Sequence, residues 1–327
     1  MIVKLFTFWV ERLSMTATIT LSVAFIILII VLGVGFSPPG KTAIHTSFFV
    51  TQILDLPIKP QTWLAGTPVR EEVMYPGPHG ELVSDVYSLS GREPRPGILL
   101  FLGANAAGRD DPDVIRLGEA LARAGFIAMF HWSQSMGGQN ELDSHEIENL
   151  VWAFRYLVSQ STVVASKTGI SGFSVGGSFA LIAASDARIR DDIAFVNSFG
   201  GYFDAHDLFL QIATRSIIDQ GAQTDWKVDP LTLRVFSNEI IGSLTDDYEK
   251  ELLTDLYDGR VIIESNELAK LSPQAIKVKE LIDGTSPESA SEIMADLPAE
   301  FLIDLDKISP SNHVHKIKTE VLVIHDV

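Results

Sequence analysis

The chain has 327 residues, of which 46% are hydrophobic and none is cysteine. This length and composition allow one large domain with a sizeable core and a further segment. Lys and Arg number 25 against 42 Asp and Glu, a formal net charge of −17, and this acidity argues against a nucleic-acid partner because phosphate binding needs a basic surface. The lack of cysteine excludes disulfides, thiolate catalysis and cysteine-ligated metal sites.

An uncharged segment near the N-terminus predicts a membrane anchor. Residues 13–40 contain no charged side chain, and a helix needs about 20 apolar residues to cross a bilayer. The alternative is a cleaved signal peptide, but the apolar region of a signal peptide has about 7–15 residues and this one is longer. We therefore expect residues 15–36 to span a lipid bilayer as an uncleaved, single-pass anchor, within an N-terminal part formed by residues 1–40.

The charges on either side of this segment predict its orientation. Lys4 and Arg12 precede the apolar residues, whereas only Lys41 closely follows them. Basic residues favour the cytoplasmic side of a membrane. We expect a cytoplasmic N-terminus and the bulk of the chain outside the cytoplasm, with residues 41–70 as a tether to the main domain.

Short apolar runs predict the strands of a first core part, residues 71–201. Two strands around a Gly/Pro turn are expected within residues 73–89. Continuous apolar runs are typical of strands buried on both faces of a parallel sheet. Such runs are found at 98–102, 126–131, 168–173 and 193–199.

Helical patterns alternate with these strands. One follows Asp111-Pro112, an N-cap residue with a first-turn proline, and another follows Asp143 and Glu146, which resemble a capping pair. A third helix is expected at 175–184. The alternation predicts a doubly wound, mostly parallel α/β sheet covered on both faces.

The pattern changes after residue 201. No strand pattern is found between residues 202 and 316, where helical spacing at 208–218, 246–256, 275–282 and 290–295 predicts a helical insertion. An apolar run at 320–325 then predicts one return strand of the core, within residues 317–327.

The sequence Gly172-Phe-Ser174-Val-Gly176 lies between the strand expected at 168–173 and the helix expected at 175–184. A serine in a Gly-x-Ser-x-Gly pattern on a strand-to-helix turn is typical of a nucleophile elbow. The glycines leave room for the sharp turn and for close packing of the helix on the strand. This context predicts that Ser174 is presented to a substrate.

These residues resemble the α/β-hydrolase superfamily, and more closely its dienelactone-hydrolase-like branch. The resemblance covers residues 71–327 and is carried by the elbow at 172–177, the strand and loop at 98–103, Arg123-Ala-Gly-Phe126, and the stretch from Ser309-Pro310 to 321–325. It implies hydrolysis of an ester or lactone by a Ser, Asp and His triad, without a metal or organic cofactor. The only close histidine pair, His313 and His315, lacks a third ligand, so we expect no metal site.

The resemblance also implies roles for individual residues. Ser174 is the expected nucleophile, in an elbow with Gly172, Gly176 and Gly177. The backbone N–H groups of Val175 and Ala104 are expected to form the oxyanion hole, with Asn105 as the alternative to Ala104. Asn105, Trp132 and Phe173 are candidates for the substrate pocket, and the helical insertion is the expected lid. His131 is expected to end the strand beside the elbow strand, as a hydrogen-bonded residue at the rim.

The remaining triad members are not assigned within the sequence. The resemblance places the acid a few residues after the strand at 320–325, and the histidine after one further strand. We therefore expect both beyond residue 327, in a longer hydrolase. The alternative is a membrane-anchored binding module that has kept the pocket and lost the triad.

Overall fold

The computed structural model of the protein describes residues 20, 22–26, 29, 33, 35, 37–104, 108–219, 222–262, 268 and 270–325. The chain forms two compact units, residues 1–66 and 67–327. Most of the predicted anchor, residues 15–36, lies outside the described residues. In the part of the chain that the structure describes, no helix is both long and apolar enough to cross a membrane.

The first unit contains two helices in the segment expected as a tether, α2 (Pro38–Ile53) and α3 (Pro60–Leu64). The Ser37 side chain accepts a hydrogen bond from the Gly40 N–H and so caps the start of α2. Proline is favoured in a first helical turn because its missing N–H would have no partner there. The described part of residues 41–70 is thus partly helical.

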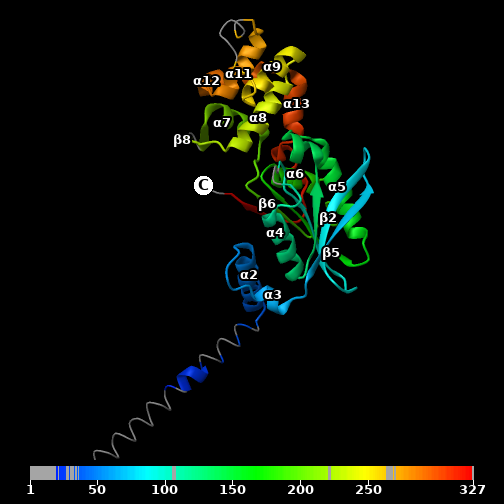
Figure 1. Ribbon diagram of the computed structural model, residues 1–327. Coiled ribbons are helices and arrows are strands. Elements are labelled where there is room, and N and C mark those ends of the chain that lie inside the picture. The colour runs from blue at the N-terminus through cyan, green and yellow to red at the C-terminus, as the bar shows by residue number, and fades with distance from the viewer. Residues whose placement is uncertain are drawn as a thin grey trace, which may run out of the picture. The chain divides into compact units, whose positions relative to one another are not determined.

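The second unit is built on a seven-stranded sheet, shown in Figure 1. The strand order is β1-β2-β4-β3-β5-β6-β9, in which β1 pairs with β2 and β2 with β4 in antiparallel fashion, and all other neighbours are parallel. The strands are β1 (Pro68–Pro76), β2 (Glu81–Leu89), β3 (Arg95–Phe101), β4 (Ile127–Trp132), β5 (Val163–Phe173), β6 (Phe195–Phe199) and β9 (Glu320–Ile324). This mostly parallel sheet with crossover helices confirms the predicted doubly wound α/β sheet.

Helices cover both faces of the sheet. They are α4 (Pro112–Arg123), α5 (His145–Ser159) and α6 (Val175–Ala184). Successive side chains of a strand point to opposite faces. Leu99 and Phe101 of β3 belong to one core cluster with residues of α5 and α6. The alternate residue Leu100 is also buried, at 2% exposure, and lies on the face that α4 covers.

The α4 helix shows how local signals set its ends. The Asp111 carboxylate accepts hydrogen bonds from the Asp113 and Val114 N–H groups, and Pro112 stands at the first helical position. Gly125, just after the helix, has a φ of 100°, which an L-residue with a side chain rarely adopts. Both ends of the helix thus depend on residues next to them, and the start is the one that the sequence analysis predicted.

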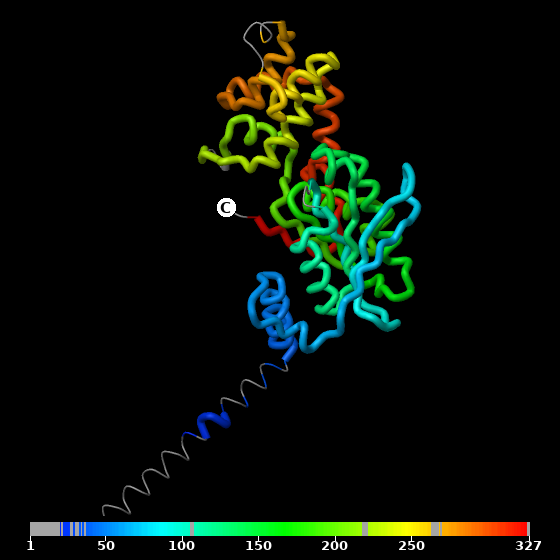
Figure 2. Tube along the Cα trace, in the orientation of Figure 1, coloured from blue at the N-terminus to red at the C-terminus, as the bar shows by residue number. Residues whose placement is uncertain are grey.

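The segment after β6 is a mostly helical insertion that ends before β9. Figure 2 shows the chain leaving the sheet and returning to it as the red strand near the C-terminus. Its helices are α7 (Ala205–Thr214), α8 (Pro230–Gly242), α9 (Asp247–Tyr257), α11 (Pro273–Asp283), α12 (Pro287–Ala295) and α13 (Ala299–Lys307).

Three details of the insertion differ from the sequence prediction. The helix expected at 208–218 ends at Thr214 because Arg215 adopts the left-handed conformation, with a φ of 54°. A short hairpin of β7 (Ser216–Asp219) and β8 (Ala222–Asp225) follows, where no strand was expected. The α8 and α13 helices were also not predicted, although Asp229-Pro230 repeats the capping signal of α4.

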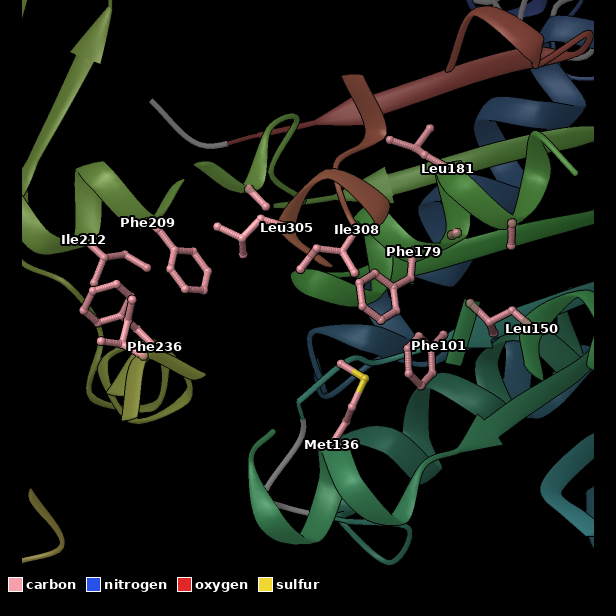
Figure 3. Packing of buried hydrophobic residues seen from close by; sticks show 14 of the residues in the cluster. Phe101, Met136, Leu150, Phe179, Leu181, Phe209, Ile212, Phe236, Leu305 and Ile308 are labelled. Carbon is pink, nitrogen blue, oxygen red and sulfur yellow. The ribbon is translucent and has the colours of Figure 1, made fainter. Parts of the chain in front are cut away.

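The core of the sheet and that of the insertion form one hydrophobic cluster. Figure 3 shows Phe101 and Phe179 at the sheet and Phe209 and Phe236 in the insertion. Leu305, near the end of α13, is 2% exposed and belongs to the same cluster. The insertion is therefore packed onto the core of this unit.

Candidate active site

Ser174 stands between the last residue of β5 and the first residue of α6. Its backbone has a φ of 51° and a ψ of −133°, a region that costs a non-glycine residue about 1–3 kcal/mol. The surroundings hold it there, because the Ser174 N–H donates to the Phe199 carbonyl at 2.7 Å and the Gly177 N–H donates to the Ser174 carbonyl at 2.8 Å. The residue is exposed. This is the sharp strand-to-helix turn that the motif predicts.

The three elbow glycines lie where no side chain fits. A Cβ on Gly172 would be 2.0 Å from the Gly176 carbonyl oxygen, and one on Gly176 would be 2.3 Å from the Phe101 carbonyl oxygen. A Cβ on Gly177 would be 2.6 Å from the Ser198 hydroxyl. These contacts bring α6 close to the neighbouring strands.

The two expected oxyanion donors lie beside the serine. Val175 is the first residue of α6, a position whose N–H has no partner within the helix and which favours a developing negative charge. Gly103 precedes Ala104 with a φ of 68°, and a Cβ on Gly103 would be 2.7 Å from the Gly176 nitrogen. Ala104, Ser174 and Val175 line the same cavity. Asn105, the alternative donor, lies outside the described residues.

The cavity at Ser174 has a volume of about 680 Å³. One side is formed by the elbow and by the segment after β6, and the other by α7 and α8 of the insertion. Its apolar lining includes Leu208, Phe209, Ile212, Val235 and Phe236. The insertion thus supplies a wall of the space into which Ser174 is exposed.

Two residues expected in the pocket lie elsewhere. The Trp132 indole N–H donates to the Asp85 carboxylate at 2.8 Å, and Trp132 is not among the described residues that line the 680 Å³ cavity. The Phe173 ring stacks on Phe199 with centroids 4.9 Å apart, and it lines a second, shallower cavity of about 360 Å³ that Ala104 shares.

The expectation for His131 is wrong in two respects. Its strand, β4, is separated from β5 by β3, and the side chain is buried at 2% exposure rather than placed at a rim. The His131 Nε2 atom lies 2.7 Å from a carboxylate oxygen of Glu146, and its Nδ1 lies 3.3 Å from the Tyr75 hydroxyl. Glu146 therefore pairs with His131 instead of capping α5.

The charge around the cavity is negative. Asp204 and Asp207 line it, and no lysine or arginine does so among the described residues. Asp204 is held as the N-cap of α7 and accepts a further hydrogen bond from Ser311. His325 also lines the cavity. None of the His, Asp and Glu side chains of the described residues form a group of three that would hold a metal.

Sequence reasoning missed Glu239, which joins the insertion to the core. Its carboxylate on α8 accepts a hydrogen bond from the backbone N–H of Leu142, a cavity-lining residue, at 2.5 Å. The pKa of Glu239 is raised to about 7, mainly by burial, with the Leu142 hydrogen bond opposing the shift and the nearby carboxylates of Glu141 and Asp143 adding to it. The Asp229-Pro230 signal could have revealed α8, but not this contact.

Comparisons with known proteins gave matches at the level of structure alone. No family model matches the chain, and no curated protein does. The esterase Est22 aligns with a TM-score of 0.38 and 15% identity, over 54% of this chain and 55% of Est22. An acylaminoacyl peptidase aligns with a TM-score of 0.44 and 14% identity, over 79% of this chain and 32% of the peptidase.

A third similar structure is an esterase of Pyrobaculum calidifontis, with a TM-score of 0.38 and 15% identity, over 78% of this chain and 93% of the esterase. The chain spans about half the length of Est22, at 55%, and about a third of the peptidase, at 32%.

Proposed function

We propose that the protein is a serine hydrolase that cleaves an ester or lactone bond, with Ser174 as its nucleophile. The observation that carries the proposal is the strained, exposed serine at the start of α6, open to a cavity of about 680 Å³. A backbone conformation of this cost persists where the fold enforces it. A serine hydroxyl that is exposed at the end of a sheet can reach a substrate and act as a nucleophile.

The arrangement supports acyl transfer. The Ser174 oxygen attacks the carbonyl carbon, and its proton passes to a general base. The negative charge that forms on the carbonyl oxygen is stabilised by the N–H groups of Val175 and Ala104. The protonated base gives its proton to the leaving alkoxide, so that the C–O bond breaks and an acyl-enzyme remains; for a lactone the alcohol stays attached to the acyl group. Water, deprotonated by the same base, then attacks the acyl carbon, and Ser174 takes the proton back as the acid is released.

The cavity favours a small or medium ester or lactone that is apolar and uncharged. Its wall from α7 and α8 is rich in Leu, Ile, Val and Phe, which bind apolar groups. Asp204 and Asp207 repel a negatively charged substrate, and the described lining offers no lysine or arginine to bind one. The insertion, residues 202–316, would act as the lid that limits substrate size.

The serine role is tested by turnover of short acyl esters and lactones with the native full-length protein. Ser174→Ala should lower kcat by at least roughly 1,000-fold, since removal of a nucleophile leaves only binding and oxyanion stabilisation. Ser291→Ala, at an exposed serine of α12, is the matched control and should be fully active. Equal turnover by wild type and Ser174→Ala would overturn the proposal.

A second candidate function is that of a binding module without catalysis. It would use the same cavity of about 680 Å³ with its apolar wall from α7 and α8. This alternative predicts ligand binding without turnover. Covalent labelling of Ser174 by a serine-directed phosphonate would contradict it, because such labelling needs an activated nucleophile.

We further propose that residues 15–36 anchor the protein in a lipid bilayer, with the N-terminus in the cytoplasm and the second unit outside it. The support is the uncharged segment and the basic residues before it. Added protease should then digest residues 67–327 on intact cells or spheroplasts. Digestion only after lysis would contradict this orientation.

A further inference from the structure

One turn of α8 is hydrogen-bonded to the core segment that leads into α5. The Asn238 side-chain amide donates to the backbone carbonyls of Gln139 and Asn140 at 3.2 and 3.3 Å. The Glu239 carboxylate accepts from the Leu142 N–H at 2.5 Å. We call these three hydrogen bonds the α8–core contact. Because its partners are 97 to 99 residues apart in sequence, the contact ties the insertion to the core.

The α8–core contact lies at the cavity of Ser174. Leu142 lines this cavity, and so do Val235 and Phe236 of α8. Residues three and four positions apart lie on the same face of a helix, which places Glu239 on the face that carries Val235 and Phe236. The contact therefore joins a cavity wall from the insertion directly to a cavity wall from the core.

Two kinds of interaction hold α8 in place. Phe236 packs edge to face on Phe209 of α7, with ring centroids 5.2 Å apart (Figure 3). Hydrophobic burial is non-directional, whereas a hydrogen bond weakens steeply when its distance or angle changes. The half-buried Leu142 N–H would also lose its partner if α8 moved away, which costs free energy. The α8–core contact therefore fixes how far this wall stands from Leu142.

We propose that Glu239 is a positioning residue that sets the size of the group admitted to the Ser174 cavity: by binding Leu142, it holds the Val235 and Phe236 side of α8 against the core. The inference rests on the proposed function. A pocket binds a ligand by enclosing most of its surface. Without the contact, α8 moves outward, and the cavity accepts a larger acyl group while it binds a small one more weakly.

The proton on Glu239 affects this contact. Burial raises the pKa of Glu239, and the carboxylates of Glu141, Asp143 and Asp304 add to the shift, while the Leu142 hydrogen bond opposes it. Burial also raises the pKa of Tyr202, with a further contribution from Glu239, so this neighbour stays neutral. Loss of the Glu239 proton thus places one more negative charge among carboxylates. It favours a position of α8 in which water reaches Glu239.

The test measures kcat and KM of the native full-length protein for esters that differ only in acyl length. Its readout is the ratio of kcat/KM for a long acyl ester to that for a short one. Glu239→Ala removes the acceptor, and we expect the ratio to rise about 10-fold, the discrimination that roughly one methylene provides in an apolar pocket. The change should lie in KM, with kcat altered less than about two-fold, because Ser174 is untouched. Asn238→Ala keeps the Leu142 hydrogen bond and should raise the ratio less.

A pH series separates this role from general damage to the fold. Titration of the catalytic base changes the turnover of all esters alike and cancels in the ratio. The wild-type ratio should rise as the pH passes through about 7, because Glu239 loses its proton and the closed position of α8 is weakened. Glu239→Gln stays neutral and keeps an oxygen for the Leu142 N–H, so its ratio should stay at the low-pH wild-type value throughout.

Glu251→Ala, at an exposed carboxylate of α9, is the matched control and should keep the wild-type ratio at every pH. Equilibrium unfolding verifies that Glu239→Ala is folded. If the folded variant keeps the ratio within about two-fold while Ser174→Ala is inactive, the role of Glu239 is overturned and the proposed function stands. If Glu239→Ala does not fold, a wild-type ratio that is the same below and above about pH 7 overturns that role instead. A fully active Ser174→Ala overturns both.

Discussion

The elbow and the helical insertion both border the cavity at Ser174, but they are built in different ways. The elbow depends on backbone packed on backbone, with Gly172 against Gly176 and Gly176 against Phe101. The α8 helix in the insertion depends on an N-cap, on packed side chains such as Phe236, and on the contact of Glu239 with Leu142. We therefore expect an atom added at an elbow glycine to disrupt the fold. Single substitutions in the insertion should each change the stability by a smaller amount.

The largest effect should come from Gly172→Ala. Its Cβ would lie 2.0 Å from a carbonyl oxygen of Gly176, and neither backbone can move without breaking the elbow. We expect the free energy of unfolding to fall by at least roughly 3 kcal/mol, or the protein not to fold. Denaturant unfolding followed by circular dichroism measures this.

The matched variant in the insertion is Gly242→Ala, at the exposed end of α8. Nothing lies within 4 Å of its Cβ position. Alanine is the better helix former by about 1 kcal/mol, so stability should be unchanged or slightly increased. Similar decreases in the free energy of unfolding for Gly172→Ala and Gly242→Ala would refute the contrast between the elbow and the insertion.

The next largest effect should depend on pH, through Glu239. Its pKa is about 7 in the folded protein against an ordinary value of 4.5, so between these values the folded protein binds the extra proton. The stability that this proton contributes is present below about pH 4.5 and is lost as the pH rises through about 7. Glu239→Gln stays neutral and keeps an oxygen to accept the Leu142 N–H.

We therefore expect Glu239→Gln to be more stable than wild type at pH 8, by up to roughly 3 kcal/mol, and the difference to vanish near pH 4. Thermal unfolding between pH 4 and pH 8 measures it. Glu251→Gln, at an exposed position of α9, should keep the wild-type pH dependence. If Glu239→Gln keeps the wild-type pH dependence of thermal stability, Glu239 is not the cause of that dependence.

The smallest effect concerns two helix caps with nearly equal geometry. Asp229 accepts hydrogen bonds from the N–H groups of Leu231 and Thr232 at 2.8 and 3.4 Å, and Asp111 accepts them from Asp113 and Val114 at 2.7 and 3.4 Å. Replacing either aspartate with alanine should lower the free energy of unfolding by about 1 kcal/mol, as measured by denaturant unfolding.

Hydrogen exchange then sharpens the comparison between the regions. If the insertion opens by itself, Asp229→Ala should speed exchange in α8 and leave α4 unchanged, and Asp111→Ala should do the reverse. Uniformly faster exchange throughout the unit in both variants would mean that the insertion and the sheet unfold together.

The parts that the sequence predicted well are those set by neighbouring residues. The cap at Asp111 and the turn at Ser174 each depend on a few consecutive residues. The end of α7 was misplaced by the same reasoning, because Arg215 adopts the left-handed conformation that sequence favours for Gly or Asn.

The sequence by itself determined the elbow, the alternation of strands and helices, and the fold class, since turn chemistry and apolar periodicity act over short distances along the chain. The tertiary structure decided which strands are neighbours, and so moved His131 away from the elbow strand and into contact with Glu146. It also decided the pairing of Asp85 with Arg109 and of Glu239 with Leu142. Such contacts join residues far apart in sequence, and no local pattern marks which partner a buried charge will find once the core has packed.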